Sequence, residues 1–323
     1  MKGNKRILAF SLMIAACLLF AASTLAMLHR CEPFYSNYYS LAWWTYIIFI
    51  ESWIHHRGGK SLLYENPRNF LLLLPLSVTV WLVFEALNFR LSDWHYINIP
   101  SNTLTRWTGY AVAYSTVLPG IFSTKALLEF LGVAKNSRAA PVSNLQKLYK
   151  PFALMGMLFL VLPLAWPQYF FPLVWLAFIF LLEPVNHRAG ASCLLSEREK
   201  GAPGNLHLLL LSGATCGFLW ELWNFRAGSK WIYSIPHFGF LKVFEMPLLG
   251  FLGFPPFALE CYAMTVSFFL LISKIREKHP PRPALGLYIA VAVSMLLFDL
   301  LVFAGIDRFT VISFEAFAPV GLR

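Results

Sequence analysis

Long apolar stretches recur along the chain, and most of them are long enough to cross a membrane as helices. A helix needs about 20 residues to span the hydrocarbon core of a bilayer. Stretches of this kind lie at residues 8–28, 69–89, 107–131, 206–225, 243–273 and 284–304. Shorter ones lie at residues 38–54, 151–166 and 168–183. The pattern therefore predicts an all-α, polytopic integral membrane protein with about nine transmembrane helices.

The first stretch also fits a second interpretation, a cleaved signal peptide. It follows the basic sequence MKGNKR, and small residues precede Met27 in the sequence STLA. However, its apolar run is long for the core of a signal peptide, and the second half of the chain contains a counterpart for it. We therefore expect a transmembrane helix.

Composition agrees with a membrane location. Of the 323 residues, 58% are hydrophobic, 17% are aromatic and only 13% are charged, and a soluble fold of this length could not bury so much apolar surface. The net charge is +10, and most Lys and Arg of the short loops fall on the side of the N-terminus. The positive-inside rule predicts a cell-membrane protein with a cytoplasmic N-terminus and a C-terminus on the opposite side. Anionic lipid accounts for the charge, so no nucleic acid partner is expected.

Two motifs occur twice, in the same order, once in each half of the chain. The first is IFIESWIHHRGGKSLL, ending at Leu63, which matches IFLLEPVNHRAGASCLL, ending at Leu195. The second is FEALNFRLSDWHYINIP at residues 84–100, which matches WELWNFRAGSKWIYSIP at residues 220–236. Each copy accommodates four helices, and an even number preserves topology, so we expect parallel rather than inverted repeats.

The predicted organisation has four parts. They are a first four-helix repeat at residues 1–135, a cytoplasmic linker at 136–150, a second four-helix repeat at 151–278, and a ninth helix with a tail at 279–323. The five cysteines form no CxxC pair. Neither a disulfide framework nor a thiolate metal site is predicted.

The first motif places a carboxylate and an imidazole four residues apart, as Glu51 with His55 and Glu183 with His187, and Arg188 follows the second pair. This spacing puts both groups on one face at the end of a helix. One interpretation is a helix end whose His and Arg reach lipid headgroups while Glu is paired. The other is a polar pocket that binds an anionic headgroup such as a phosphate. A metal site is less favoured, because nothing fixes the two pairs facing each other.

The second motif carries polar residues near the end of a hydrophobic helix. They are Glu85, Asn88 and Arg90 in the first copy, and Glu221, Asn224 and Arg226 in the second. A carboxylate there is costly unless paired, and the arginines are the expected partners. The motif is either a structural network that locks helices together or a functional site with two carboxylates near one pseudo-symmetric centre. Trp94, Tyr96, Trp231 and Tyr233 follow as interfacial anchors or as part of that site.

The last helix of the second repeat differs from its counterpart in the first. Its sequence, FEMPLLGFLGFPPFALECYAM, contains Glu245 and Glu260, where the first repeat has Gly109 and Thr124. Intramembrane carboxylates are functional candidates, and the prolines are expected to break the helix beside a pocket. The alternative is a kinked helix with a buried, protonated Glu. We expect the chemistry to lie in the second repeat.

These residues resemble a known family in their order. Trp220-Glu221, then Trp231 with Tyr233, then Glu245-Met246-Pro247 is similar to the Trp-Asp, Trp-x-Tyr and Pro-x-Glu-Glu pattern of the integral-membrane lycopene cyclases, which are also duplicated. Glu221 stands in place of Asp, and Glu245 alone stands in place of the paired Glu. The resemblance implies acid chemistry on a carotenoid-type lipid.

The predicted arrangement of four, four and one helices is similar to that of UbiA-type intramembrane prenyltransferases. Enzymes of that family bind magnesium diphosphate through Asp-rich motifs, whose positions are occupied in this sequence by Glu51 with His55 and Glu183 with His187. Because the Asp-rich motifs are missing, magnesium-dependent prenyl transfer is not expected.

Together these features predict a membrane-embedded enzyme that acts on a long apolar lipid of isoprenoid or carotenoid type. Glu85, Glu221, Glu245 and Glu260 are the predicted acids. The predicted substrate-binding residues are Glu51, His55, Asn88, Glu183, His187, Arg188, Asn224, Arg226, Trp231 and Tyr233. The expected partners are membrane lipid and a hydrophobic small molecule, with no cofactor. The alternatives are a proton-coupled transporter of lipids or small molecules, with Glu as the coupling site, and a non-catalytic scaffold subunit.

Overall fold

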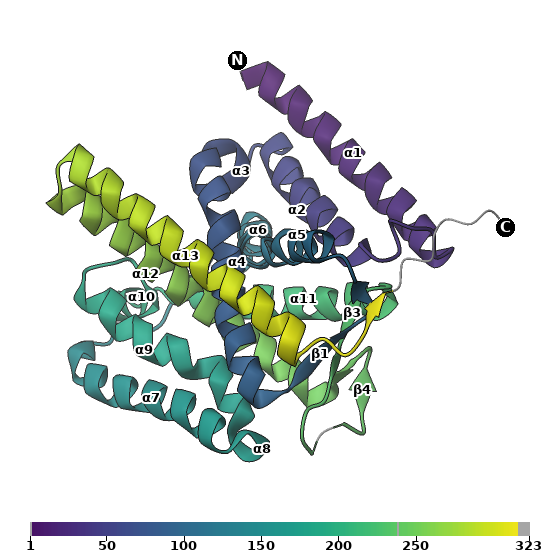
Figure 1. Ribbon diagram of the computed structural model, residues 1–323. Coiled ribbons are helices and arrows are strands. Elements are labelled where there is room, and N and C mark those ends of the chain that lie inside the picture. The colour runs from purple at the N-terminus through teal and green to yellow at the C-terminus, as the bar shows by residue number, and fades with distance from the viewer. Residues whose placement is uncertain (1, 238, 316–323) are drawn as a thin grey trace.

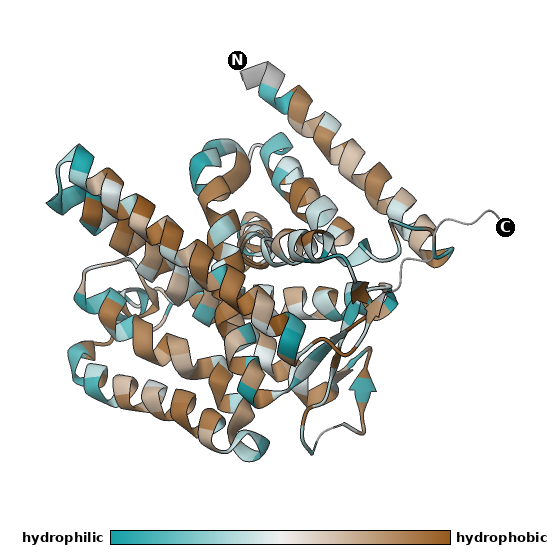
Figure 2. Ribbon diagram, viewed as in Figure 1, coloured by the Kyte–Doolittle hydropathy of each residue, from teal (hydrophilic) through white to brown (hydrophobic). Residues whose placement is uncertain are grey.

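The computed structural model describes residues 2–237 and 239–315, and most of these residues are helical (Figure 1). Eight of the described segments are long and apolar enough to cross a membrane: Lys5–Leu28, Pro67–Leu91, Thr103–Phe130, Leu145–Ala165, Pro167–Arg188, Gly204–Arg226, Leu248–Lys278 and Pro281–Phe309. Figure 2 shows hydrophobic residues along the long helices and hydrophilic residues mainly at their ends. The prediction of an all-α chain with several helices long and apolar enough to span a membrane is confirmed.

The first half of the chain forms six helices and two strands. They are α1 (Lys2–Leu28), α2 (Tyr38–His56), α3 (Leu62–Glu65), α4 (Pro67–Leu91), β1 (Trp94–Ile97), β2 (Ile99–Pro100), α5 (Thr103–Tyr114) and α6 (Val117–Phe130). Helix α2 corresponds to the segment predicted at residues 38–54. It packs against α1 and α6, and buries Trp43, Ile47 and Glu51.

The second half contains the remaining elements. They are η1 (Leu145–Leu148), α7 (Tyr149–Ala165), α8 (Pro167–Phe170), η2 (Phe171–Leu173), α9 (Val174–Arg188), α10 (Leu194–Glu199), α11 (Gly204–Arg226), β3 (Lys230–Tyr233), β4 (Lys242–Val243), β5 (Met246–Pro247), η3 (Leu248–Gly253), α12 (Phe254–Lys278), α13 (Pro281–Phe309) and β6 (Phe314–Glu315). Helix α12 packs against α9 and α11. Contacts of α11 with α6, and of α13 with α4, join the two halves.

Two of the predicted spans differ from the helices of the structure. The span predicted at residues 107–131 is divided into α5 and α6, and the hydroxyl of Ser77 on α4 lies at the break. It donates to the Tyr114 carbonyl at 2.6 Å and accepts from Leu118 N–H at 3.0 Å. A backbone break inside a membrane needs such partners, because lipid supplies none.

The predicted start of the second of these spans, at residue 243, is wrong. Residues 242–247 form the antiparallel pair of β4 and β5, and helix begins only with η3 and α12. Proline is tolerated in the first turn of a helix, where its missing N–H has no partner to lose, and α12 has proline in this turn. Glu245 therefore lies in the β4–β5 turn and not inside an apolar helix.

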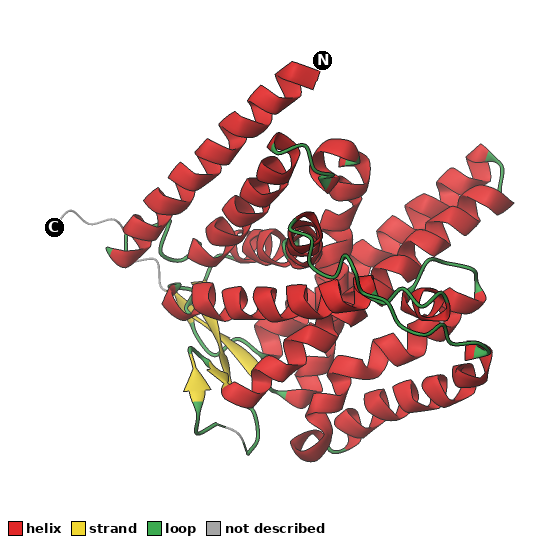
Figure 3. Cartoon of the chain, turned by 180° about the vertical axis from the view of Figure 1, so that it is seen from behind, coloured by secondary structure: helices red, strands yellow, loops and turns green. Residues whose placement is uncertain are grey.

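Short strands gather at one end of the helix bundle, which we call the strand end (Figure 3). There β1 pairs antiparallel with β3, so that Trp94 lies opposite Tyr233 and Tyr96 lies opposite Trp231. Strand β2 pairs in parallel with β6, which follows α13. The opposite end, which carries α3 and α10, is called the loop end.

Helix α13 is fixed to the strand end by a buried ion pair. Arg106 on α5 donates to both carboxyl oxygens of Asp307, at 2.8 and 2.6 Å. The Trp107 indole and the Tyr110 hydroxyl donate to the same carboxylate. Beyond α13, Tyr96 N–H donates to the Thr310 carbonyl and Ile312 N–H donates to the Tyr96 carbonyl. The C-terminal helix thereby holds β1 in place.

We predict that Asp307→Ala destabilises the protein by about 3 kcal/mol, because it leaves the buried Arg106 charge without its counterion. Thermal unfolding in detergent measures the change. The matched control is Glu129→Ala, which removes the exposed pair with Lys125 and should cost less than about 1 kcal/mol. Equal effects of the two substitutions would contradict this role for the ion pair.

Candidate functional site

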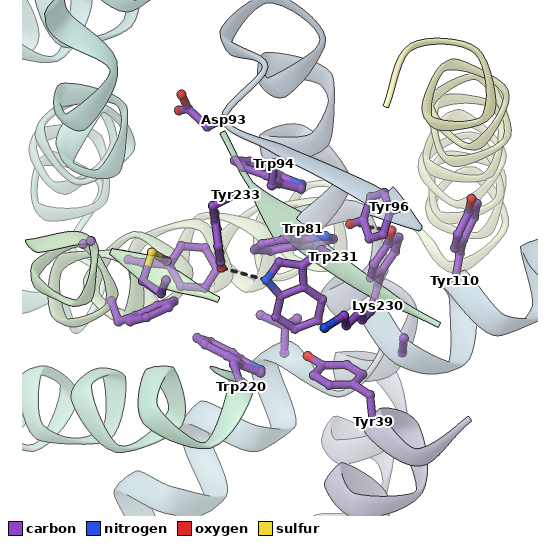
Figure 4. A pocket seen from close by; sticks show the side chains of 18 of the residues that line it. Tyr39, Trp81, Asp93, Trp94, Tyr96, Tyr110, Trp220, Lys230, Trp231 and Tyr233 are labelled. Carbon is purple, nitrogen blue, oxygen red and sulfur yellow. Dashed lines mark hydrogen bonds between the residues drawn. The ribbon is translucent and has the colours of Figure 1, made fainter. Parts of the chain in front are cut away.

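A cavity of about 460 Å³ lies at the strand end between the two halves of the chain, a size within the range of small-molecule sites. Both halves contribute to its wall, from α2, α4, β1 and α5 in the first and from α9, α11, β3, η3 and α12 in the second. Aromatic side chains line it (Figure 4): Tyr39, Trp81, Trp94, Tyr96, Tyr110, Tyr114, Phe171, Trp175, Trp220, Trp231, Tyr233, Phe254 and Phe257. The apolar, aromatic wall suits a hydrophobic ligand.

Glu85 of α4 is fully buried, and its carboxyl group binds three aromatic donors. Oε1 accepts from Trp81 Nε1 at 2.8 Å and from Trp94 Nε1 at 3.1 Å. The Tyr96 hydroxyl also donates to Oε1, and it accepts from the Tyr114 hydroxyl at 3.0 Å. Glu85 thus holds β1 onto its own helix, and the aromatic donors line the cavity in front of it.

Glu221 of α11 is equally buried and occupies the corresponding position in the second half. Its Oε1 accepts from the Tyr233 hydroxyl at 2.7 Å, and that hydroxyl accepts from Trp231 Nε1 at 2.8 Å. Burial raises the pKa of Tyr233 well above its usual value, and the nearby Glu221 raises it further. The Tyr233 hydroxyl therefore remains protonated at neutral pH, and its single proton is directed at Glu221 Oε1 on the wall of the cavity.

Asn88 and Asn224 connect each helix to the strand that follows it. Asn88 Oδ1 accepts from Asp93 N–H at 2.8 Å, and its Nδ2 donates to the Trp94 carbonyl at 2.8 Å. Asn224 accepts from Trp231 N–H at 3.0 Å and donates to the Trp231 carbonyl at 2.9 Å. Both side chains are fully buried. They position the strands and do not line the cavity wall.

The prediction that Arg90 and Arg226 pair with these carboxyl groups is wrong. Arg90 donates to the Ala165 carbonyl at 3.4 Å, and the Arg226 guanidinium lies over the ring of Phe225. Both arginines are exposed at helix ends, whereas the carboxyl groups face the interior. Oε1 of each carboxyl group accepts from indole or phenol donors, which bring no second charge into the apolar bundle. Oε2 of each has no hydrogen-bond partner among the described residues.

Of the two further carboxyl groups predicted to gather around Glu221, Glu245 lies close enough for an electrostatic interaction with it, and Glu260 binds elsewhere. Glu245 forms an ion pair with Lys230 at 2.5 Å, and Lys230 lines the cavity. Glu260 is fully buried on α12, where it accepts from the backbone N–H of Phe178 at 2.7 Å. Thr124, its predicted counterpart, contacts the Tyr46 hydroxyl at 2.9 Å. Glu260 therefore binds a neighbouring helix and does not face the cavity.

The carboxyl groups of the first motif bind the backbone at the starts of the short helices α3 and α10. Glu51 accepts from Leu63 N–H at 3.0 Å, and Glu183 accepts from Leu195 N–H at 2.9 Å. In each case the donor lies in the first turn of the short helix, where N–H groups lack intrahelical partners. The identical geometry favours the structural interpretation of these two residues.

The histidines of the first motif have different surroundings. His55 stacks on Tyr64, with ring centroids 4.3 Å apart. His187 contacts the Tyr149 hydroxyl at 2.7 Å and Glu199 at 3.3 Å. Arg188 is exposed at the end of α9. Among the described residues no group of three or more His, Cys, Asp or Glu side chains is placed to hold a metal ion.

The sequence interpretation missed several residues of the wall, above all Asp93. Asp93 and Lys230 each come directly before the repeated Trp of the second motif. Comparison of the two copies was enough to show that this position carries opposite charges. The contributions of Tyr39, Trp81 and Trp175 depend on packing between helices that are distant in sequence, and no local pattern indicates them.

Comparison with protein-family models, curated proteins and solved structures gives no match for this chain.

We predict that Asp93 makes the protein less stable as pH rises. Burial raises the pKa of the Asp93 carboxyl to about 7, whereas the unfolded value is about 3.9. The folded state therefore binds more protons between these values, and its stability falls as pH rises through that window. Melting temperatures in detergent from about pH 5 to about pH 8 should decline for the natural protein and decline less for Asp93→Asn. Parallel curves for the two proteins would refute this effect.

Proposed function

We propose that the protein is a membrane-embedded enzyme that protonates a double bond of a long apolar lipid, of isoprenoid or carotenoid type, and so drives cyclisation or hydration. The observation that carries the proposal is the aromatic cavity in which the Tyr233 hydroxyl is backed by the buried carboxyl group of Glu221. An acid, a relay and a carbocation-stabilising wall are the parts that such a reaction needs.

In the proposed reaction Glu221 is the protonated acid. When Glu221 is protonated, the hydrogen bond seen in the structure reverses: Glu221 donates to the Tyr233 oxygen, and the Tyr233 O–H turns to the cavity. The Glu221 proton then moves to the Tyr233 oxygen while the Tyr233 proton moves to a carbon of the double bond, so that a carbocation forms in the cavity. The Trp231 N–H, which already donates to the Tyr233 oxygen, stabilises charge on that oxygen during transfer. Cyclisation ends when a neighbouring carbon returns a proton along the same path, and hydration ends when water adds to the cation and releases a proton.

The two halves differ in a way that supports placing the acid in the second one. Three donors converge on one oxygen of Glu85, whereas two donors, the Tyr233 hydroxyl and the Trp231 indole, interact with Glu221. Glu85 is accordingly assigned a scaffolding role. The aromatic wall favours an enzyme over a proton-coupled transporter, whose path would need polar groups that reach an aqueous face.

We predict that Glu221→Gln and Tyr233→Phe each reduce turnover about 100-fold or more, the usual contribution of general acid catalysis. Turnover is measured by mass spectrometry of lipids from cells that express the natural protein, a variant or no protein. Glu260→Gln is the matched control, since it neutralises a buried carboxyl outside the cavity and should keep turnover. Full activity of the Glu221→Gln protein would refute the assignment.

The proposal also includes a nine-crossing topology with parallel repeats and a cytoplasmic N-terminus. Helix α2 connects the strand end, where Gly228 N–H donates to the Tyr35 carbonyl, to the loop end, where α3 follows. Helix α2 is therefore the ninth membrane crossing, in addition to the eight apolar segments. Equivalent hydrogen bonds of Glu51 and Glu183, and of Asn88 and Asn224, support the repeat.

We predict that single cysteines introduced by Lys60→Cys and Ala191→Cys, in a variant without the natural cysteines, are labelled from the cytoplasmic side. Both positions lie in the loops that follow the first motif, which parallel repeats place on one side of the membrane. Asn98→Cys at the strand end is the control and should be labelled from the other side. Labelling of residues 60 and 191 from opposite sides would exclude parallel repeats.

A further inference from the structure

Among the described residues, Asp93 is the charged residue of the cavity wall whose side chain has no hydrogen-bond partner. It lies between α4 and β1, its side chain is buried, and neither carboxyl oxygen has a hydrogen-bond partner among the described residues. Figure 4 places it at the edge of the labelled group, beyond Trp94 and Tyr233 and far from Tyr110. The cavity is thus aromatic along its length with one unsatisfied acceptor at this end.

The other charged groups of the wall are already neutralised. Lys230 pairs with Glu245 at 2.5 Å, and Arg106 pairs with Asp307 at 2.6 Å. The neighbouring His95 contacts Ser234 at 3.0 Å, and burial lowers the pKa of its imidazole, so that it is mainly neutral at pH 7. None of these groups serves Asp93 as a counterion.

A buried polar group without a partner is rare, because it has lost hydration and gained nothing in return. A ligand that carries a hydrogen-bond donor would supply the missing interaction. A neutral hydroxyl fits better than an ammonium group, since burial raises the pKa of Asp93 to about 7. The carboxyl is then partly protonated at neutral pH and can accept from, or donate to, the same hydroxyl group.

We propose that Asp93 binds a hydroxyl group of the ligand, so that the cavity takes a lipid alcohol and not a pure hydrocarbon. This inference rests on the proposed lipid-binding role of the cavity and specifies its substrate class. The hydroxyl end lies at Asp93, and the apolar chain runs along Trp94, Tyr233 and Trp231.

The test compares two probes that differ only at this end, geranylgeraniol and its methyl ether. Binding to the purified full-length protein in detergent is followed by quenching of tryptophan fluorescence, since Trp94, Trp175, Trp220 and Trp231 line the cavity. We expect the alcohol to bind about 10-fold more tightly than the ether, as one hydrogen bond to a buried carboxyl implies. Equal binding of the two probes, or no binding of either, overturns the inference.

Two variants assign the preference to Asp93. Asp93→Ala should weaken alcohol binding about 10-fold and leave ether binding unchanged, whereas Asp93→Asn, which keeps an acceptor and a donor, should retain part of the preference. Asp299→Ala is the control, because Asp299 is a partly buried carboxyl that binds Thr79 on α4 away from the cavity. An equal loss for both probes in Asp93→Ala contradicts the inference. Selective alcohol binding without turnover would instead reject only the proposed enzymatic function.

Discussion

The pairing of β1 with β3 is the interaction on which the rest of the strand end depends. Each strand follows a long helix, and the backbone of a segment that leaves a helix near lipid must find partners within the protein. Asn88 and Asn224 bind each strand to its own helix, and the antiparallel ladder then binds the strands to each other. The register that results brings Trp94, Tyr96, Trp231 and Tyr233 to one place, and the cavity lies among them.

The buried carboxyl groups of this bundle accept hydrogen bonds mainly from neutral donors, and one oxygen each of Glu85, Glu183, Glu221 and Glu260 has no partner among the described residues. Glu85 and Glu221 accept from indole and phenol groups, Glu260 accepts from a backbone N–H, and Glu51 and Glu183 accept from the first turns of short helices. Neutral donors avoid the cost of moving a second charge out of water. Two ion pairs lie at the strand end, where Arg106 fixes α13 and Lys230 fixes the β4–β5 hairpin.

The two halves of the chain carry the same two sequence motifs and differ in the segment that follows the second motif. In the first half, helix α5 follows β2 directly, whereas in the second half the β4–β5 hairpin and η3 occupy the corresponding stretch before α12. The position before the repeated Trp is Asp93 in one half and Lys230 in the other. Lys230 finds a partner in the hairpin and Asp93 finds none among the described residues. This difference, within otherwise matching surroundings, makes the cavity chemically asymmetric.

The sequence by itself determined the membrane class, the positions of most helices and the two repeated motifs, because hydrophobic length and local spacing are properties of neighbouring residues. It also indicated Trp231, Tyr233 and Glu221 as parts of one site. Tertiary structure alone decided the partners of each carboxyl group, the hairpin that carries Glu245, and the separation of Glu260 from the cavity. These features depend on which distant helices pack together, and on which side chain, an indole, a phenol or an arginine, lies within hydrogen-bond distance of a buried carboxyl oxygen. Contacts between side chains of distant helices leave no periodic pattern in the sequence, so the place of Trp175 in the cavity wall depends on the assembled structure.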